Sequence, residues 1–205
     1  MTTDRKVSMG TLGLVAVVTF VWCAAFAGAR ATYGARTTAD EPQYLMTAIS
    51  LAEDASLDVS DERAAGRYRA FHEVGLPLQE EIRADGTRVS PHDPLLPVLL
   101  ALPTAWGGWL AAKLTLAALA AVLAAVMVWV AVARFGVRVP VAILTVGAFA
   151  LAAPLAVYST QVYPEIVAAL VLAIGAGAAT GPLRRGGVVT AAGAVVALPW
   201  LSVKY

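Results

Sequence analysis

Two adjacent carboxylic acids, Asp40 and Glu41, follow the first apolar segment of the chain by about ten residues. If that segment crosses a membrane, the pair lies at the membrane surface. A carboxylate there could take a proton from an acceptor hydroxyl, or hold a divalent cation together with water and phosphate oxygens. An acid before Glu-Pro is also a common helix cap. The residues alone leave the chemical and the structural interpretation open.

Three further ionisable residues lie near the same boundary. Glu165 is the only acid after Asp93, and it precedes a long apolar segment. An acid at a membrane boundary needs a partner or water, although the first turn of a helix also favours a negative charge through the helix dipole. His92 and Asp93 stand just before the second apolar block. A lone histidine is more often structural or solvated than chemical, so both interpretations again stay open.

Basic residues offer a second kind of chemistry. Arginines can bind a lipid phosphate through two parallel hydrogen bonds, although most loop arginines only solvate the loop. The candidates are Arg30, Arg36, Arg63, Arg67 and Arg69. We expect Lys113 to extend its amine to the outer lipid headgroups. The sequence contains no glycine-rich phosphate loop, HExxH or GxSxG, and Cys23 is its only cysteine; these features exclude an intrachain disulfide and a zinc-finger pattern.

The composition shows which elements must position these residues. The chain has 205 residues, of which 59% are hydrophobic and 14% charged, against about 25% charged in soluble domains. Residues 30–94 hold twelve of the fourteen acids and seven of the fifteen Lys and Arg residues. Long, nearly uncharged stretches argue against a soluble enzyme, a nucleic-acid binder or a disordered protein. The net charge of +1 gives no reason to expect a polyanionic partner.

The apolar segments predict an all-α, polytopic transmembrane bundle. Roughly 20 helical residues cross the hydrocarbon core of a bilayer. We predict about five spans, at residues 11–29, 109–133, 139–158, 164–180 and 188–203. Residues 95–105 are too short to span and are bounded by prolines, which predicts a re-entrant or interfacial helix that ends at Gly107-Gly108. The first segment could instead be a signal peptide with a cleavage site at residues 27–29.

Short-loop charges predict the orientation. If the spans alternate, three basic pairs fall on one side, which the positive-inside rule makes cytoplasmic. The pairs are Arg5/Lys6, Arg134/Arg138 and Arg184/Arg185. The amino terminus would then be cytoplasmic, with the loop 30–94, the turn 161–165 and Lys204 outside. The chain stops just after the fifth span, and we expect it to be the truncated first part of a larger bundle.

The outward loop is longer than a connector needs to be, and long loops usually carry function or their own structure. Pro42 in a first turn predicts a juxtamembrane helix over about 41–54, with Tyr44 and Ala48 on one face. Asp85-Gly86 predicts a hairpin with a two-residue turn.

Four short motifs carry a family resemblance. They are Ala39-Asp40-Glu41-Pro42-Gln43-Tyr44-Leu45, His92-Asp93-Pro94-Leu95, Tyr163-Pro164-Glu165 and Leu198-Pro199-Trp200. With the order of spans and loop, they resemble the GT-C superfamily of integral-membrane glycosyltransferases, nearest to its protein O-mannosyltransferase and aminoarabinose-transferase branches. The resemblance covers essentially the whole chain, as the amino-terminal half of such a protein. A Lys-Pro that is common where the family's loop re-enters the membrane is absent here.

The resemblance implies a function in the cell envelope. Asp40 would be the catalytic base and Glu41 a supporting acid, with Tyr44, His92, Asp93 and Glu165 binding substrate. It also implies that Asp40 and Glu165 could hold a divalent cation, Mg²⁺ or Mn²⁺. The donor would be a polyprenyl-phosphate sugar, and the acceptor, of unknown identity, would lie on the outer face of a bacterial inner membrane.

Two rival hypotheses are non-catalytic. The first is a transporter subunit, which would carry ionisable or broken-helix sites near the middle of the bilayer. The second is a membrane scaffold with a partner-binding outer loop. For the scaffold, loop charges would change binding and Asp40 would be dispensable.

Overall fold

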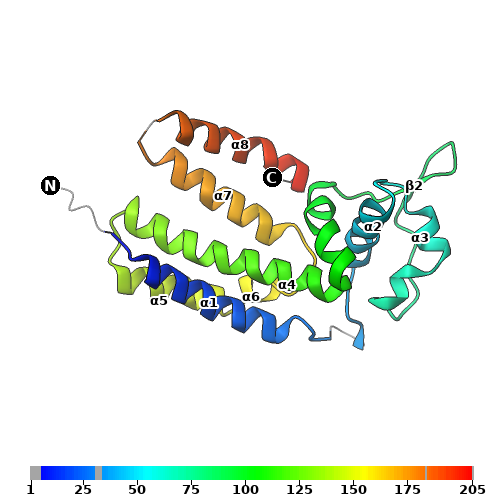
Figure 1. Cartoon of the computed structure of the whole chain (residues 1–205), viewed down its shortest axis with the longest axis horizontal. Helices are drawn as coiled ribbons and strands as arrows, with labels where there is room; N and C mark the ends of the chain where they lie inside the picture. The colour runs from blue at the N-terminus through cyan, green and yellow to red at the C-terminus, as the bar shows by residue number, and fades with distance from the viewer. Residues whose placement is uncertain (1–5, 31–33, 183, 205) are drawn as a thin grey trace.

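The computed structural model describes residues 6–30, 34–182 and 184–204, and this part of the chain is mostly helical, which confirms the all-α prediction. Long helices run side by side (Figure 1). Helices α1 (Met9–Phe26), α5 (Val139–Ala150) and α7 (Glu165–Ala179) all contact α4 (Leu95–Ala133), and α8 (Arg185–Leu201) packs mainly on α7. Helix α4 is therefore the central element of the bundle.

Two helices of the described chain, α1 and α4, are long and apolar enough to cross a membrane. Helices α5, α7 and α8 are also apolar but have 12, 15 and 17 residues, so by length there are fewer spans than the five predicted. The segment predicted at 139–158 is interrupted, since α5 ends at Ala150 and the short α6 covers Leu155–Tyr158. Pro154 lies between them, and proline lacks an amide hydrogen and disfavours helix in the residue before it.

The break predicted at Gly107-Gly108 is present inside α4. Gly107 has φ −145° and ψ 19°, and Gly108 has φ 61° and ψ −155°, a region that is open essentially to glycine alone. The two parts of α4 consequently point in different directions (Figure 1). The first part, from Leu95, is the segment predicted as a re-entrant or interfacial helix.

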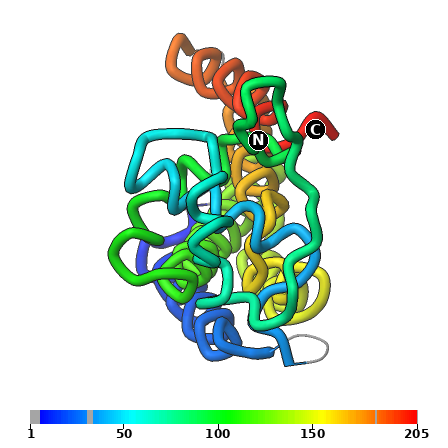
Figure 2. Tube along the Cα trace, turned by 90° about the vertical axis from the view of Figure 1, so that its right-hand side faces the viewer, coloured from blue at the N-terminus to red at the C-terminus, as the bar shows by residue number. Residues whose placement is uncertain are grey.

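The described part of the outward loop, residues 34–94, forms a cap at one end of the bundle. Figure 2 shows this cap face-on. The cap contains α2 (Glu41–Glu53), α3 (Ser60–Ala64), the 3₁₀ helix η2 (Arg67–Ala70) and strands β1 (Glu81–Ile82) and β2 (Arg88–Val89). Helix α2 matches its predicted range to within one residue. The hairpin is present, but Arg83 N–H donates to Thr87 O at 2.9 Å, so the loop has three residues. The predicted two-residue turn is wrong because Gly86, at φ 89°, is the third loop residue.

A continuous core joins the cap to the bundle. Leu45, Met46 and Ala48 of α2 are completely buried and pack with Leu96 and Leu100 at the start of α4. The burial of these apolar side chains fixes α2 against the bundle. The N-terminal end of α2, which carries Asp40 and Glu41, therefore has a defined position.

The basic pairs lie at the opposite end of the bundle from the cap. Helix α1 begins at this end, α4 and α7 end there, and α5 and α8 begin there (Figure 1). Lys6, Arg138 and Arg184 each stand next to one of these helix ends, while Arg5 lies outside the described residues. The outward loop, residues 30–94, thus holds twelve acids and seven basic residues, whereas the short loops at the far end carry basic pairs.

Candidate functional site

The carboxylate of Glu41 is the most thoroughly bonded acid at the cap end of the bundle. It is 1% exposed. One oxygen accepts hydrogen bonds from the backbone N–H and the hydroxyl of Thr38, at 2.8 and 3.3 Å. The other accepts from Val162 N–H at 2.8 Å. The Glu41 carboxylate thus holds the amide and hydroxyl of a residue three positions earlier, just before the helix begins. Glu41 thus ties α2 to the segment before α7.

Lys113 completes this arrangement from α4. Its amine lies 3.4 Å from Glu41 Oε1 and donates a hydrogen bond to the carbonyl of Arg36 at 2.8 Å. The expectation that Lys113 reaches the headgroups is wrong, because its side chain is only 3% exposed. Since a charge without water needs a partner, the ion pair and the carbonyl replace the lost hydration. Glu41 and Lys113 are a structural anchor.

Asp40 has very different surroundings. Asp40 is the N-terminal cap residue of α2, as the helix-cap interpretation expects, but its 42% exposed side chain makes no capping hydrogen bond to the described residues. The backbone N–H of Asp40 donates to the Tyr163 hydroxyl at 3.4 Å, which connects α2 with the approach to α7. The carboxylate itself stays available for a ligand or a proton.

His92 lies beside Asp40, as the sequence analysis placed it in the same site. Its Nε2 is 3.8 Å from Asp40 Oδ1, which is too long for a hydrogen bond, and among the described residues this buried nitrogen has no hydrogen-bond partner. The imidazole stacks on the Tyr44 ring with centroids 4.7 Å apart. Burial lowers the pKa of His92, and Lys204 lowers it further, whereas Asp40 and Asp93 act in the opposite direction. The imidazole is therefore neutral near pH 7.

The phenol of Tyr44 lies among several carboxylates at the cap end of the bundle. Burial raises the pKa of this phenol, and three nearby carboxylates raise it further. They belong to Asp40, Glu165 and Asp93. Burial also raises the pKa of Tyr163, whose ring packs edge-on to that of Tyr44. Both phenols therefore stay protonated and can donate hydrogen bonds at neutral pH.

Glu165 and Asp93 join the site from two other segments. Glu165 is the first residue of α7, and its Oε2 is buried without a hydrogen-bond partner in residues 6–30, 34–182 and 184–204. Asp93 Oδ2 accepts from the N–H of Val203 at 3.2 Å, which attaches the end of α8 to the cap. Of the six residues that the sequence analysis selected, Asp40, His92, Asp93 and Glu165 thus lie near the Tyr44 side chain. The sixth, Glu41, is directed to Val162 and Lys113 instead.

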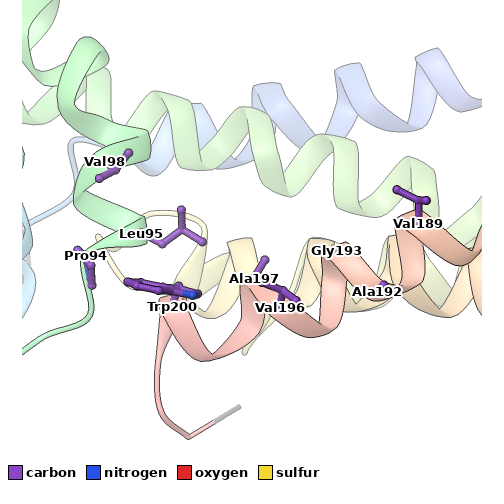
Figure 3. A pocket seen from close by; sticks show the side chains of 9 residues that line it. All are labelled: Pro94, Leu95, Val98, Val189, Ala192, Gly193, Val196, Ala197 and Trp200. Carbon is purple, nitrogen blue, oxygen red and sulfur yellow. The ribbon is translucent and has the colours of Figure 1, made fainter. Parts of the chain in front are cut away.

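An apolar groove of about 730 Å³ begins next to Asp93. It runs between the first turns of α4 and one face of α8 (Figure 3). Pro94 and Trp200 lie at one end and Val189 at the other. The nine lining residues are all apolar or glycine: Pro94, Leu95, Val98, Val189, Ala192, Gly193, Val196, Ala197 and Trp200. A groove of this kind suits a hydrocarbon chain.

The ligand set for a divalent cation is incomplete at this end. Within the described residues, one group of three His, Cys, Asp or Glu side chains has metal-ligand spacing, and it contains neither Asp40 nor Glu165. A cation held by those two residues stays a prediction, and we derive no step through it.

No family model, curated protein sequence or solved structure matches this chain. The resemblance to the GT-C superfamily therefore stays a prediction.

Sequence analysis missed two members of the site. Tyr163 appeared only as part of a motif, yet its hydroxyl contacts Asp40 and also donates to the Thr38 carbonyl at 3.5 Å. Lys113 was assigned to the headgroups. A single cation within an otherwise uncharged stretch was the available signal, because such a residue usually has a buried partner.

Proposed function

We propose that this chain is part of a membrane glycosyltransferase of GT-C type. It transfers a sugar from a polyprenyl-phosphate carrier to an acceptor on the outer face of the membrane, with Asp40 as the general base. The observation that carries the proposal is the contrast between two neighbouring carboxylates. The Glu41 carboxylate is fully hydrogen-bonded and structural. The Asp40 carboxylate is partly exposed and lies beside the neutral His92 and an apolar groove.

The apolar outer surface supports a membrane bundle of five spanning segments. Large apolar side chains are exposed on the short helices as well as on α1. Examples are Leu14 at 64%, Leu144 at 74%, Leu172 at 60% and Val195 at 69%. Water-exposed surfaces rarely hold apolar patches of this extent. We infer that α5 with α6, α7 and α8 also cross the bilayer, together with the turns that flank them.

Charge separation supports the predicted orientation. The basic pairs of the short loops lie at the end of the bundle opposite the cap, and the positive-inside rule assigns such an end to the cytoplasm and the cap to the outside. The Asp40 carboxylate then lies at the outer surface. A lipid-linked donor confines its sugar phosphate to that depth.

We assign the polyprenyl-phosphate donor to the apolar groove between α4 and α8. Its apolar walls take the prenyl chain, and its Pro94 end brings the phosphate toward Asp93 and His92. Lys204 is close enough to lower the pKa of His92, and a cation there stabilises the negative charge of a departing phosphate.

The reaction is a direct displacement. Asp40 accepts the proton of an acceptor hydroxyl as that oxygen forms a bond to the anomeric carbon. The bond from the same carbon to the phosphate oxygen breaks, and the electron pair leaves with the polyprenyl phosphate. Protonated Tyr44 and Tyr163 hold sugar hydroxyls or phosphate oxygens by donating hydrogen bonds.

Transfer is tested with the full chain in membranes and a panel of radiolabelled polyprenyl-phosphate hexoses and aminopentoses. We expect label to move from the lipid to an acceptor fraction. Asp40→Asn should lower the rate at least about 100-fold, since general bases contribute roughly 10²–10⁴-fold, with unchanged membrane insertion.

Asp85→Asn is the matched control, because Asp85 is an exposed acid of the hairpin loop whose carboxylate bonds only to Thr87 in the described structure. It should leave transfer unchanged. Transfer by the Asp40→Asn chain at the wild-type rate would contradict the proposal and favour a non-catalytic scaffold, as would no transfer by the wild-type chain from any donor.

A further inference from the structure

A second group of acids lies where α2 ends and α3 begins. One carboxylate oxygen from each of Asp54, Asp61 and Glu62 lies within 4.8 Å of the other two. A Ca²⁺ ion with oxygen ligands at about 2.4 Å bridges oxygens up to roughly 4.8 Å apart. The spacing of the three carboxylates therefore matches the reach of a single ion.

Glu62 provides an independent reason to expect a ligand. It is 2% exposed, and both of its carboxylate oxygens are buried with no partner at hydrogen-bond geometry in the part of the chain that the structure describes. Because one of them belongs to the group of three, this unpartnered side chain is directed into the group. A buried carboxylate without a partner is strongly unfavourable, and a cation bound by the group would remove that cost.

Two arginines of the cap are already engaged with other residues. Arg67 donates to both oxygens of Glu53, at 2.8 and 2.6 Å. Arg63 donates to Glu80 and to the Leu76 carbonyl. The Ser50 hydroxyl also donates to two backbone carbonyls. Within the described residues, neither arginine is hydrogen-bonded to Glu62.

Electrostatics at the helix end also favours a cation. Asp54 is the C-terminal cap of α2, where the negative end of the helix dipole disfavours a carboxylate. Three acids thus lie together at the negative end of the α2 dipole.

We propose that Asp54, Asp61 and Glu62 bind one Ca²⁺ ion that joins the end of α2 to the start of α3. All ligands are oxygens, and two of the three residues are exposed, so water can complete the shell. Ca²⁺ accepts six to eight oxygens in flexible geometry, whereas Mg²⁺ requires near-ideal octahedral geometry. The site does not depend on the proposed transferase activity.

The direct test is calorimetric titration of the purified full chain, stripped with EGTA, with CaCl₂ and separately with MgCl₂. We expect one Ca²⁺ per chain, with a Kd of roughly 10⁻⁴–10⁻³ M or tighter, and weaker Mg²⁺ binding. The thermal unfolding midpoint should rise with Ca²⁺ concentration, because binding to the folded state stabilises it.

Glu62→Gln and Asp61→Asn should each weaken Ca²⁺ binding at least tenfold. Asp61 is exposed, so its variant keeps the test valid if Glu62→Gln does not fold. Glu81→Gln is the control, since Glu81 is an exposed acid of the same cap outside the group; it should bind as the wild type does. No Ca²⁺ binding by the wild type, tighter Mg²⁺ binding, or unchanged affinity in the Asp61→Asn chain would overturn the proposal.

Discussion

Asp40 and Glu41 are neighbours in sequence, yet their carboxylates have opposite surroundings. Glu41 is buried against Lys113 and accepts hydrogen bonds from Thr38 and Val162. Asp40 is partly exposed and faces His92. A general base must be free to bind a proton, whereas an anchor must not change its bonding. We therefore assign proton transfer to Asp40 and positioning to Glu41.

The stability of the site should depend on pH through His92. Its folded-state pKa is lowered, so the unfolded chain binds more protons once the pH falls toward the ordinary value of 6.5. The stability that His92 contributes is present above that value and is lost as the pH falls through the lower folded pKa. Relative to His92→Gln, the wild-type thermal unfolding midpoint should decrease between about pH 8 and about pH 5.

Tryptophan fluorescence of both chains during heating, at a series of pH values, measures this difference. The prediction would be contradicted if the difference in unfolding midpoint stayed constant with pH, or if the wild type gained stability relative to the variant on acidification. Either result would show that burial does not lower the pKa of the His92 imidazole.

At the scale of elements, the Glu41–Lys113 pair joins α2 to α4. Both side chains are almost completely buried, and removing one partner of a buried pair leaves an uncompensated charge. We expect Glu41→Gln to lower the free energy of unfolding by about 3–5 kcal/mol, and Lys113→Met by a similar amount. The double variant should cost less than the sum of the two.

The exposed pair of Glu53 and Arg67 provides the comparison, since both side chains are more than 40% exposed. Glu53→Gln should change the free energy of unfolding by less than about 1 kcal/mol. Equal effects of Glu41→Gln and Glu53→Gln would show that the buried pair is not an anchor.

Sequence analysis predicted elements whose signals are local. Pro42 marked the start of α2, and Gly107-Gly108 marked the break in α4. It overestimated the continuity of the segment 139–158, in which Pro154 follows the end of α5. It also missed the bonds of Glu41 to Val162 and Lys113, because they join residues far apart in the sequence and no local pattern encodes them.

At the scale of the whole molecule, the residues selected from sequence come together at one end of the bundle because three helices begin there. These helices are α2, α4 and α7. Because successive spans cross the membrane in opposite directions, the sequence predicted that these helix starts lie on the same side. The individual contacts were not predictable, since they depend on how α2 packs on α4.

The central claim is that the cap end of the bundle lies on the outer side of the membrane, because the proposed chemistry requires Asp40 there. The buried Cys23 can be replaced by alanine, and a single cysteine introduced by Ala84→Cys in the cap or by Pro182→Cys between α7 and α8. Both positions are exposed. Labelling intact cells with a membrane-impermeant maleimide measures the side directly. We predict labelling of the Ala84→Cys chain in intact cells and of the Pro182→Cys chain only after permeabilisation; the reverse pattern would contradict the account.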